Sequence, residues 1–436
     1  MKNTYLLAFA LTAAVAAAMT SCGTTAVTDS LPASETSTSA SVSTSASTKS
    51  GKTTSASEET TTAATSETAS VEQLSGTSDS TYTKRDLAQV ADTSDAKSVT
   101  VSDGKTINIT EEGVYVISGT AEDCTIRVEA DEQAKVQLVL DGVEITNSDF
   151  PAIYVVSADK VFVTTTDSDN TLTVSGQFTS DGDTNTDAVI FSKDDLVLNG
   201  VGTLNVTSNY GNGITCKDDM KVTGGTYNVT CALDAFEAND SISVSDGTFN
   251  ITTNKDGFHC ENDEAEGTIV ISGGTFTING GSDGLQACAM LQIDGGTFKI
   301  NAAEGLEATY IVINDGDIDI YATDDGINAS ASTNAYETAI VINGGYVKVE
   351  VGPGDTDGLD ANGSIYVNGG TVDVTAQMSS FDYDRTAEFN GGTIIVNGTE
   401  VDSIPQSMMG GGGFGGGGGR GGHGGGFGGF GGGQMF

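Results

Sequence analysis

Carboxylate side chains recur at one position of a repeating unit in the middle of the chain, with a spacing that suits cation binding. Each is an Asp or Glu followed by glycine or another small residue, and a second polar side chain follows three residues later. Two such columns would repel each other unless a cation lay among them, and hard cations such as calcium bind several oxygens in flexible geometry. The first column comprises Asp234, Asp256, Asp283, Glu304, Asp325 and Asp357, and the second comprises Thr215, Glu237, His259, Gln286, Glu307, Asn328 and Asp360.

The stacked acids form four candidate metal sites, for which we predict several calcium ions. A single Asp-Gly pair is ordinary turn chemistry, because Asp caps its own backbone and Gly accepts positive φ. The prediction therefore rests on the repetition and on the second acid of each coil. If His259 were a ligand, a softer ion such as zinc or cadmium would also fit. The four groups are Asp234 with Glu237 and Asp256, Asp283 with Glu304 and Glu307, Asp355 with Asp357 and Asp360, and Asp324 with Asp325.

The same edge leaves an enzymatic alternative open. A polysaccharide lyase would need calcium to acidify the proton next to a uronate carboxylate, and a nearby Lys or Arg as the base. Lys255 directly precedes Asp256, and Lys217 lies near the same edge, so these two are the candidate catalytic residues of a lyase. The only two histidines are His259 and His423, and no serine is placed for a Ser/His/Asp triad.

A repeat positions these acids, and its period predicts the fold. A glycine turn recurs at intervals of 20 to 29 residues, which is the period of a solenoid with insertions in a few coils. Apolar residues stand two and four positions after this glycine and three positions before it, so each coil holds short strands with one buried face. We predict an all-β fold, a single-stranded parallel β-helix. The turn glycines are Gly202, Gly225, Gly247, Gly274, Gly296, Gly316, Gly345, Gly370 and Gly392.

The charge balance excludes some partners. The chain has 60 acidic and 18 basic residues and a net charge of -42, so phosphate backbones and anionic membrane surfaces would repel it. We therefore expect no nucleic-acid partner, but a cation or a partner that carries one. The chain has no tryptophan, which argues against the usual flat stacking platform for neutral glucans. The tyrosines that remain available for sugar contacts are Tyr310, Tyr321, Tyr336 and Tyr366.

The two ends of the chain differ from the repeat in composition. Residues 1–22 have the layout of a secretory signal, and Met19-Thr20-Ser21-Cys22 resembles a lipoprotein cleavage site that would leave Cys22 lipidated. Residues 23–85 are a Ser/Thr-rich segment predicted to be a disordered linker, and residues 406–436 are a Gly-rich tail. We expect an exported monomer on the cell surface or the outer face of a membrane. Only the lipid anchor of the protein would contact the membrane. The β-helix would occupy residues 86–405.

The repeats resemble a known family. The segments Gly113 to Thr120, Ile190 to Gly200 and Asn212 to Thr226, together with the Asp-Gly and Gly-Gly-Thr coils, are similar to the carbohydrate-binding β-helix proteins on the surface of clostridia and related bacteria. The resemblance implies a right-handed parallel β-helix similar to pectate lyases, and binding of calcium and of acidic plant polysaccharide such as polygalacturonate, the backbone of pectin. Two positions depart from the pattern, with Ala235 after Asp234 and Glu304 in place of Asp.

These observations predict a carbohydrate-binding protein that uses calcium on the stacked acidic edge to bind acidic polysaccharide. The metal would bridge two anions, since a chain of this charge cannot attract a polyuronate directly. A calcium-dependent polysaccharide lyase is the enzymatic alternative, and a structural surface adhesin is the other. The sequence does not assign individual sugar-binding residues.

Overall fold

The computed structural model describes residues 81–262, 264, 266–354 and 356–405. The predicted signal segment with Cys22, nearly all of the predicted linker, the Gly-rich tail and Asp355 lie outside the described residues. Within the described ranges the secondary structure is all β, with no helix and hence none that could cross a membrane.

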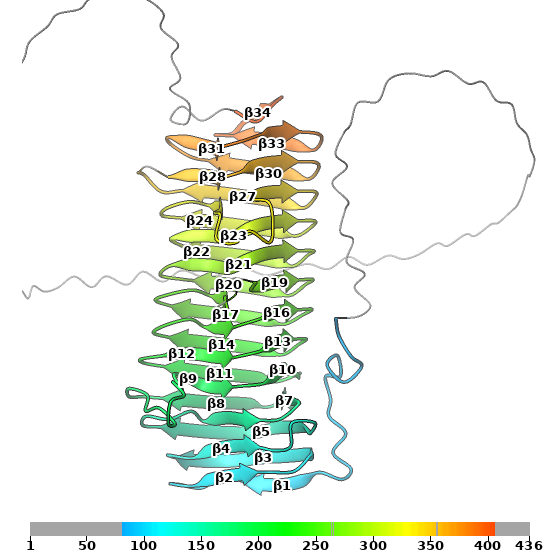
Figure 1. Cartoon of the computed structure of the whole chain (residues 1–436), viewed down its shortest axis with the longest axis vertical. Helices are drawn as coiled ribbons and strands as arrows, with labels where there is room; N and C mark the ends of the chain where they lie inside the picture. Colours follow the sequence, from blue (N-terminus) through cyan, green and yellow to red (C-terminus); the bar gives the residue numbers. More distant parts are fainter. Residues whose placement is uncertain (1–80, 263, 265, 355, 406–436) are drawn as a thin grey trace, which may run out of the picture. The chain divides into compact units, whose positions relative to one another are not determined.

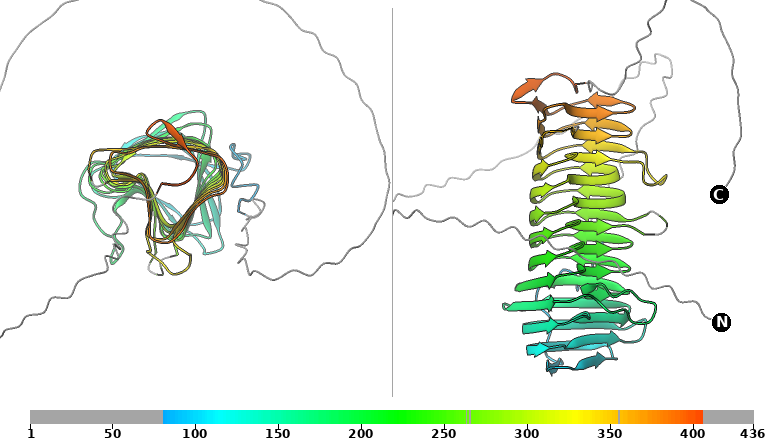
Figure 2. Two further views of the ribbon diagram at one scale, coloured as in Figure 1. Left: turned by 90° about the horizontal axis from the view of Figure 1, so that it is seen from above. Right: turned by 90° about the vertical axis from the view of Figure 1, so that its left-hand side faces the viewer.

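The described residues form a solenoid of about 12 coils, which confirms the predicted parallel β-helix. Strands of successive coils pair in parallel, and seen along the axis the coils superimpose (Figures 1 and 2). Three faces result, which we number I to III. Within each coil the chain passes from face I through the glycine turn to face III, and then through the acidic turn to face II.

Face I carries strands that precede the glycine turn. Strands β3 and β5 continue from it into face III, while β21 and β23 enter it from face II. Its strands are β1 (Lys97–Thr100), β3 (Gly113–Glu122), β5 (Lys135–Asn147), β7 (Lys160–Thr165), β10 (Asp195–Gly200), β13 (Asp219–Val222), β16 (Ser241–Val244), β19 (Thr268–Ile271), β21 (Asp283–Ile293), β23 (Glu304–Ile313), β26 (Ala339–Ile342), β29 (Ser364–Val367) and β32 (Ala387–Phe389).

Faces II and III complete each coil. Face II consists of the first parts of β21 and β23 with β2 (Thr106–Ile109), β4 (Thr125–Glu129), β6 (Ile153–Ser157), β9 (Ala188–Ser192), β12 (Asn212–Cys216), β15 (Phe236–Ala238), β18 (Phe258–Cys260), β25 (Ile327–Ala329), β28 (Asp357–Ala361) and β31 (Ser379–Tyr383). Face III consists of the last parts of β3 and β5 with β8 (Asp169–Val174), β11 (Thr203–Ser208), β14 (Thr226–Cys231), β17 (Thr248–Thr253), β20 (Thr275–Asn279), β22 (Thr297–Ala302), β24 (Asp317–Ala322), β27 (Tyr346–Val351), β30 (Thr371–Thr375) and β33 (Thr393–Val396), and β34 (Thr399–Val401) pairs with β33 in antiparallel.

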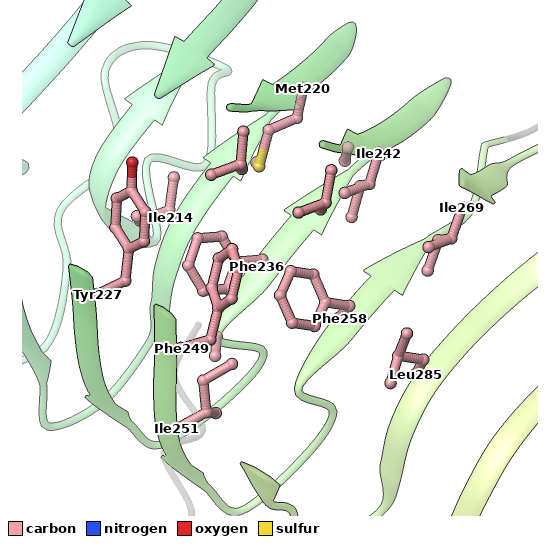
Figure 3. Close-up of a cluster of buried hydrophobic side chains, with 14 of the residues drawn as sticks. Ile214, Met220, Tyr227, Phe236, Ile242, Phe249, Ile251, Phe258, Ile269 and Leu285 are labelled. Carbon is pink, nitrogen blue, oxygen red and sulfur yellow. The ribbon is translucent and has the colours of Figure 1, made fainter. Parts of the chain in front are cut away.

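The interior is a stack of like side chains. The alternating burial of the strands directs every second residue inward, and parallel pairing places equivalent residues over one another. Tyr227, Phe249, Phe276 and Phe298 stack with ring centroids 5.4, 4.6 and 4.4 Å apart. Figure 3 shows part of this stack inside the coils. A slip of one residue would turn these rings to solvent, so the stack helps to hold the register.

The predicted turn glycine has positive φ in every coil of the series except the first. Gly225, Gly247, Gly274 and their successors have positive φ, between 75° and 143°, where residues with a Cβ are strained. In the first coil of the series Gly200 has the positive φ of 118° in place of Gly202. At Gly202 an added Cβ would instead collide with the Thr166 carbonyl oxygen, 1.8 Å away.

The segment before β1 packs along face I. Arg85 lies over the Phe162 ring, 4.5 Å from its centroid. The Gln89 side-chain amide donates to the Thr223 carbonyl oxygen at 2.8 Å, and Asn199 donates to the Asp86 carbonyl oxygen at 3.1 Å. These contacts link β7, β10 and β13 through a segment far from them in sequence (Figure 1, blue).

We expect the aromatic stack to be a main source of stability. Phe276→Ala removes a fully buried ring that stacks on two neighbours, and should lower the free energy of unfolding by about 3–5 kcal/mol. Thr277→Ala, on the outer side of the same strand, should change it by no more than about 0.5 kcal/mol. Chemical denaturation of both variants measures the difference, and equal costs would contradict this account of the core.

Candidate functional site

The strand registers stack the two predicted polar columns at the turn from face III to face II. In the second column Thr215 pairs with Glu237, Glu237 with His259, and His259 with Gln286. Glu307, Asn328 and Asp360 continue it in the same register, and the structure adds Asp382 above Asp360. The predicted acids therefore line one edge of the solenoid, which we call the acidic edge.

Several first-column side chains also hold the coils together. One side-chain oxygen of a residue accepts the backbone N–H of the next coil, as Asp234 does from Asp256 at 3.1 Å and Asp256 does from Asp283 at 2.9 Å. Asp325 accepts from the Asp357 N–H in the same way at 2.8 Å. The turn chemistry of Asp and its proposed role toward cations are thus compatible, because a carboxylate has a second oxygen.

Basic side chains already neutralise the lower part of the acidic edge. Lys255 Nζ lies 2.9 Å from Asp234 Oδ2, and His259 Nδ1 lies 2.8 Å from Asp256 Oδ2. Lys217 Nζ lies 3.0 Å from Glu237 Oε1. Of the first predicted metal group, the structure brings Asp234 and Asp256 together with His259, while Glu237 faces Lys217. Three acids here have three basic partners.

The pKa values of Asp256 and His259 follow their pairing, while burial raises the pKa of Asp234 despite Lys255. Burial alone would raise the pKa of Asp256, but the hydrogen bonds from His259 and from the Asp283 backbone, together with the charges of His259 and Lys255, hold that pKa below the ordinary value. For His259 burial opposes charging, yet the hydrogen bond with Asp256 and the charge of Asp234 raise its pKa. The imidazole is therefore more easily protonated than a free one, and a protonated ring cannot bind a metal.

The second predicted metal group has no such neutralisation. Asp283, Glu304 and Glu307 offer oxygens that all lie within 4.8 Å of one another. Among the described residues none of the three forms an ion pair with Lys, Arg or His. Asp283 is only 5% exposed, and its carboxylate accepts no hydrogen bond from any described residue. A largely buried carboxylate loses most of its hydration, so this position favours a proton or a cation.

Burial and like charges shift the pKa values of Asp283 and Glu304 upward. Burial, followed by the charges of Asp256 and Glu304, raises the pKa of Asp283 to about 8. Burial raises the pKa of Glu304 to about 7, and the charges of Glu307 and Asp325 add to it. Asp283 and Glu304 therefore bind protons near neutral pH when no cation is present.

Neutral donors orient the two glutamates without compensating their charge. Gln286 donates to Glu307 Oε2 at 2.7 Å, and the Ser330 hydroxyl donates to Glu307 Oε1 at 3.0 Å. Asn328 donates to Glu304 Oε2 at 3.0 Å. These two amides and one hydroxyl preorganise the carboxylate oxygens of Glu304 and Glu307 on β23.

The remaining predicted acids lie above this group. Asp324 is exposed and Asp325 half-buried, and the charges of both raise the pKa of Glu304, so the fourth predicted group adjoins the second. Burial and the charges of Asp325 and Asp357 raise the pKa of Asp360 to about 7. The third group is thus present as Asp357 and Asp360, without a described Asp355.

A small cleft opens beside Glu307 at the corner between faces II and I. Its volume is about 110 Å³. The turns after β18 and β25, which account for the longest repeats, contribute Glu261 and Ser332 to its wall. The lining residues are Cys260, Glu261, Gln286, Ala287, Cys288, Glu307 and Ser332. Sequence reasoning did not predict this cleft, although the lengths of the two repeats mark where the turns protrude.

A further acidic group was missed by sequence reasoning. Asp195, Asp218 and Asp219 bring ligand atoms within 4.8 Å of one another at the turn from face II to face I. Lys160 Nζ lies 3.1 Å from Asp195 Oδ2, and burial raises the pKa of Asp218 to about 6. The signal was the Asp-Asp pair repeated in two successive coils.

Comparisons with known proteins identify a family to which the chain is similar. A family model described as carbohydrate-binding domain-containing protein matches residues 103–358 and 306–407. A protein of that description from Acetivibrio thermocellus is 40% identical over 126 residues, which are 28% of this chain and 44% of the relative. The chain therefore spans less than half of that relative's length. A solved structure is described as the polysaccharide lyase-like protein from C. thermocellum, in a gadolinium derivative. It matches this chain with 21% identity and a TM-score of 0.33, and the match covers 71% of this chain and 99% of the chain in that structure.

We expect Asp283 to make stability depend on pH when a chelator is present. Its folded-state pKa of about 8 lies above the ordinary value of 3.8, so the folded state holds the proton more tightly. That contribution is complete below about pH 4 and is lost as pH rises through about 8. Asp283→Asn, which cannot ionise, should therefore be more stable than the parent at pH 9, by roughly 1–3 kcal/mol.

Chemical denaturation with chelator at pH 4 and pH 9 measures this effect. Asp317→Asn removes an exposed acid from face III and should show no comparable gain at pH 9. A parent chain whose stability relative to Asp283→Asn rose between pH 4 and pH 9 would contradict the shift assigned to Asp283.

Proposed function

The chain belongs to the family of carbohydrate-binding domain-containing proteins, and from this membership we propose that it binds acidic polysaccharide through calcium held by Asp283, Glu304 and Glu307. The ligand class is a polyuronate such as polygalacturonate. The observation that carries the proposal is the buried Asp283 carboxylate, which has no hydrogen-bond donor among the described residues and faces two further carboxylates.

The donor set suits a hard cation. All three side chains supply carboxylate oxygens, and calcium accepts six to eight oxygen ligands in flexible geometry, so open positions would remain for a ligand. A bound cation supplies positive charge that neutralises the carboxylates and attracts uronate groups. The raised pKa values of Asp283 and Glu304 mean that binding would release protons, as metal binding to protonated ligands does.

The charge of the chain supports a role for the cation as a bridge. A protein with a net charge of -42 repels a polyuronate unless positive charge is supplied at the contact. Gln286, Asn328 and Ser330 hold the glutamates in place, so the chain's own residues orient the oxygens before the ligand arrives. The cleft at Glu307 gives sugar groups access next to these oxygens.

Binding is better supported than cleavage. A lyase would need Lys217 or Lys255 as a base, and each forms an ion pair with a carboxylate. Burial alone would lower the pKa of Lys255, but the hydrogen bond to Asp234 and its charge raise it. A lysine with a raised pKa is a poorer base at neutral pH.

Export and anchoring complete the proposal. The Met19-Thr20-Ser21-Cys22 motif supports lipidation of Cys22, and the Ser/Thr-rich segment after it would act as a spacer between membrane and solenoid. A protein placed in this way would hold polysaccharide at the cell surface.

Retention of the full chain on immobilised polygalacturonate tests the proposal. We expect retention in calcium and loss in chelator. Glu304→Gln/Glu307→Gln removes two ligands and should weaken calcium-dependent retention at least about tenfold, while Asp317→Asn/Glu350→Gln, with the same change of charge on face III, should retain the parent's affinity.

Three outcomes decide against parts of the proposal. Retention that persists in chelator would rule out the calcium bridge, and equal loss in both double variants would rule out the assigned site. Ultraviolet absorbance from unsaturated uronate products would make the protein a lyase, and Lys217→Met and Lys255→Met would then show which lysine serves as the base.

A further inference from the structure

We propose that the outer side of face III, from β11 to β22, is a second carbohydrate-binding surface that contacts uncharged polysaccharide without a cation. We call it the neutral face and define it by the three outward side chains of each of five strands. They are Thr203, Asn205, Thr207, Thr226, Asn228, Thr230, Thr248, Asn250, Thr252, Thr275, Thr277, Asn279, Thr297, Lys299 and Asn301. Figure 1 shows the five strands in adjacent coils.

The neutral face lacks acidic residues in a chain that has 60 of them. Every outward position is Thr or Asn except Lys299. β-propensity favours Thr on strands, but propensity alone does not account for the absence of acids. The next coils of the same face, β24, β27 and β30, carry Asp317, Asp319, Glu350 and Asp373 at equivalent positions.

The threonine side chains of the neutral face are free to bind a ligand. Its strands alternate between buried residues and exposed or half-buried ones. Among the described residues, none of its threonine hydroxyls makes a hydrogen bond with another protein group. Each hydroxyl can donate one bond and accept two. The result is an array of unused donors and acceptors on a regular lattice.

An asparagine ladder makes part of this array rigid. Asn228 donates to Asn205 Oδ1 at 2.8 Å, and Asn250 donates to Asn228 Oδ1 at 2.9 Å. Asn205 in turn donates to the Asn170 carbonyl oxygen at 3.1 Å. Asn228 and Asn250 each keep a second N–H for a ligand, whereas Asn205 also donates to the Thr171 hydroxyl at 3.5 Å. The side chains of the ladder lose little freedom on binding.

The size of the face fits a stretch of polysaccharide. Five coils at about 4.8 Å spacing extend over about 19 Å, and three outward positions on a strand span about 13 Å. Two exposed aromatic side chains lie just beyond it, because Tyr321 follows Asn301 in register, and Tyr346 follows Asp317. They are 41% and 40% exposed, and aromatic rings with a polar tip suit sugar contacts.

Charge decides the class of ligand. A polyuronate would meet no bound cation on this face and would be repelled by the acids elsewhere on the chain. An uncharged polysaccharide meets no such barrier, and its hydroxyl groups can donate to and accept from Thr and Asn. The family's carbohydrate-binding character supports this occupant, and the inference does not depend on the cation site at Asp283.

Retention of the full chain on insoluble cellulose and on insoluble mannan, both in chelator, tests the inference. The parent should be retained on at least one of them. Thr248→Glu/Thr252→Glu places two acids on the neutral face and should weaken retention about tenfold, the change expected when a hydrogen-bonded contact is lost. Thr275→Glu/Asn279→Glu on the next coil should have the same effect.

A matched control keeps the result specific. Thr371→Glu/Thr375→Glu adds the same two charges to β30, outside the neutral face, and should leave retention unchanged. All of these variants should retain the calcium-dependent binding to polygalacturonate and the parent's circular dichroism. No retention of the parent on either neutral polysaccharide would overturn the inference, as would equal retention of the neutral-face variants and the β30 control.

Discussion

The stacking of each coil on the coil before it is the constraint on which the rest of this structure depends. Parallel hydrogen bonds hold successive strands about 4.8 Å apart, and the registers pair equivalent positions of the repeat. Residues at the same position of the repeat are therefore placed next to one another in successive coils. For Phe249, Phe276 and Phe298 this produces a continuous aromatic stack, and for the acids of the turn it produces repulsion.

The repulsion between stacked carboxylates on the acidic edge is reduced in two ways. In its lower part Lys217, Lys255 and His259 lie beside the carboxylates and neutralise them within the protein. Around Asp283 and Glu304 the neighbours are neutral donors and further acids, so charge must come from solution as protons or cations. The same repeat position is thus structural in some coils and, in our proposal, binds a cation in others.

The two proposed binding surfaces are neighbours because of the coil topology. The turn that follows each face III strand carries the acid of that coil, as Thr253 at the end of β17 leads to Asp256. The neutral face and the acidic edge thus occupy successive parts of the same coils. In our proposals one surface would bind uncharged polysaccharide and the other would bind uronates through calcium.

The sequence by itself determined the repeat, the parallel β-helix and the columns of acids, because stacked coils leave a periodic pattern that can be read without coordinates. Tertiary structure decided which acids are compensated. Lys255 and Asp234 are 21 residues apart, and nothing in their spacing shows that the lysine reaches back one coil to Asp234. Nor does it show that, among the described residues, no basic side chain pairs with the Asp283 carboxylate. The cleft at Glu307 likewise depends on how two long turns fold over a corner. Side-chain reach and burial at those points are properties of the assembled coils, since each contact joins residues from different turns of the solenoid.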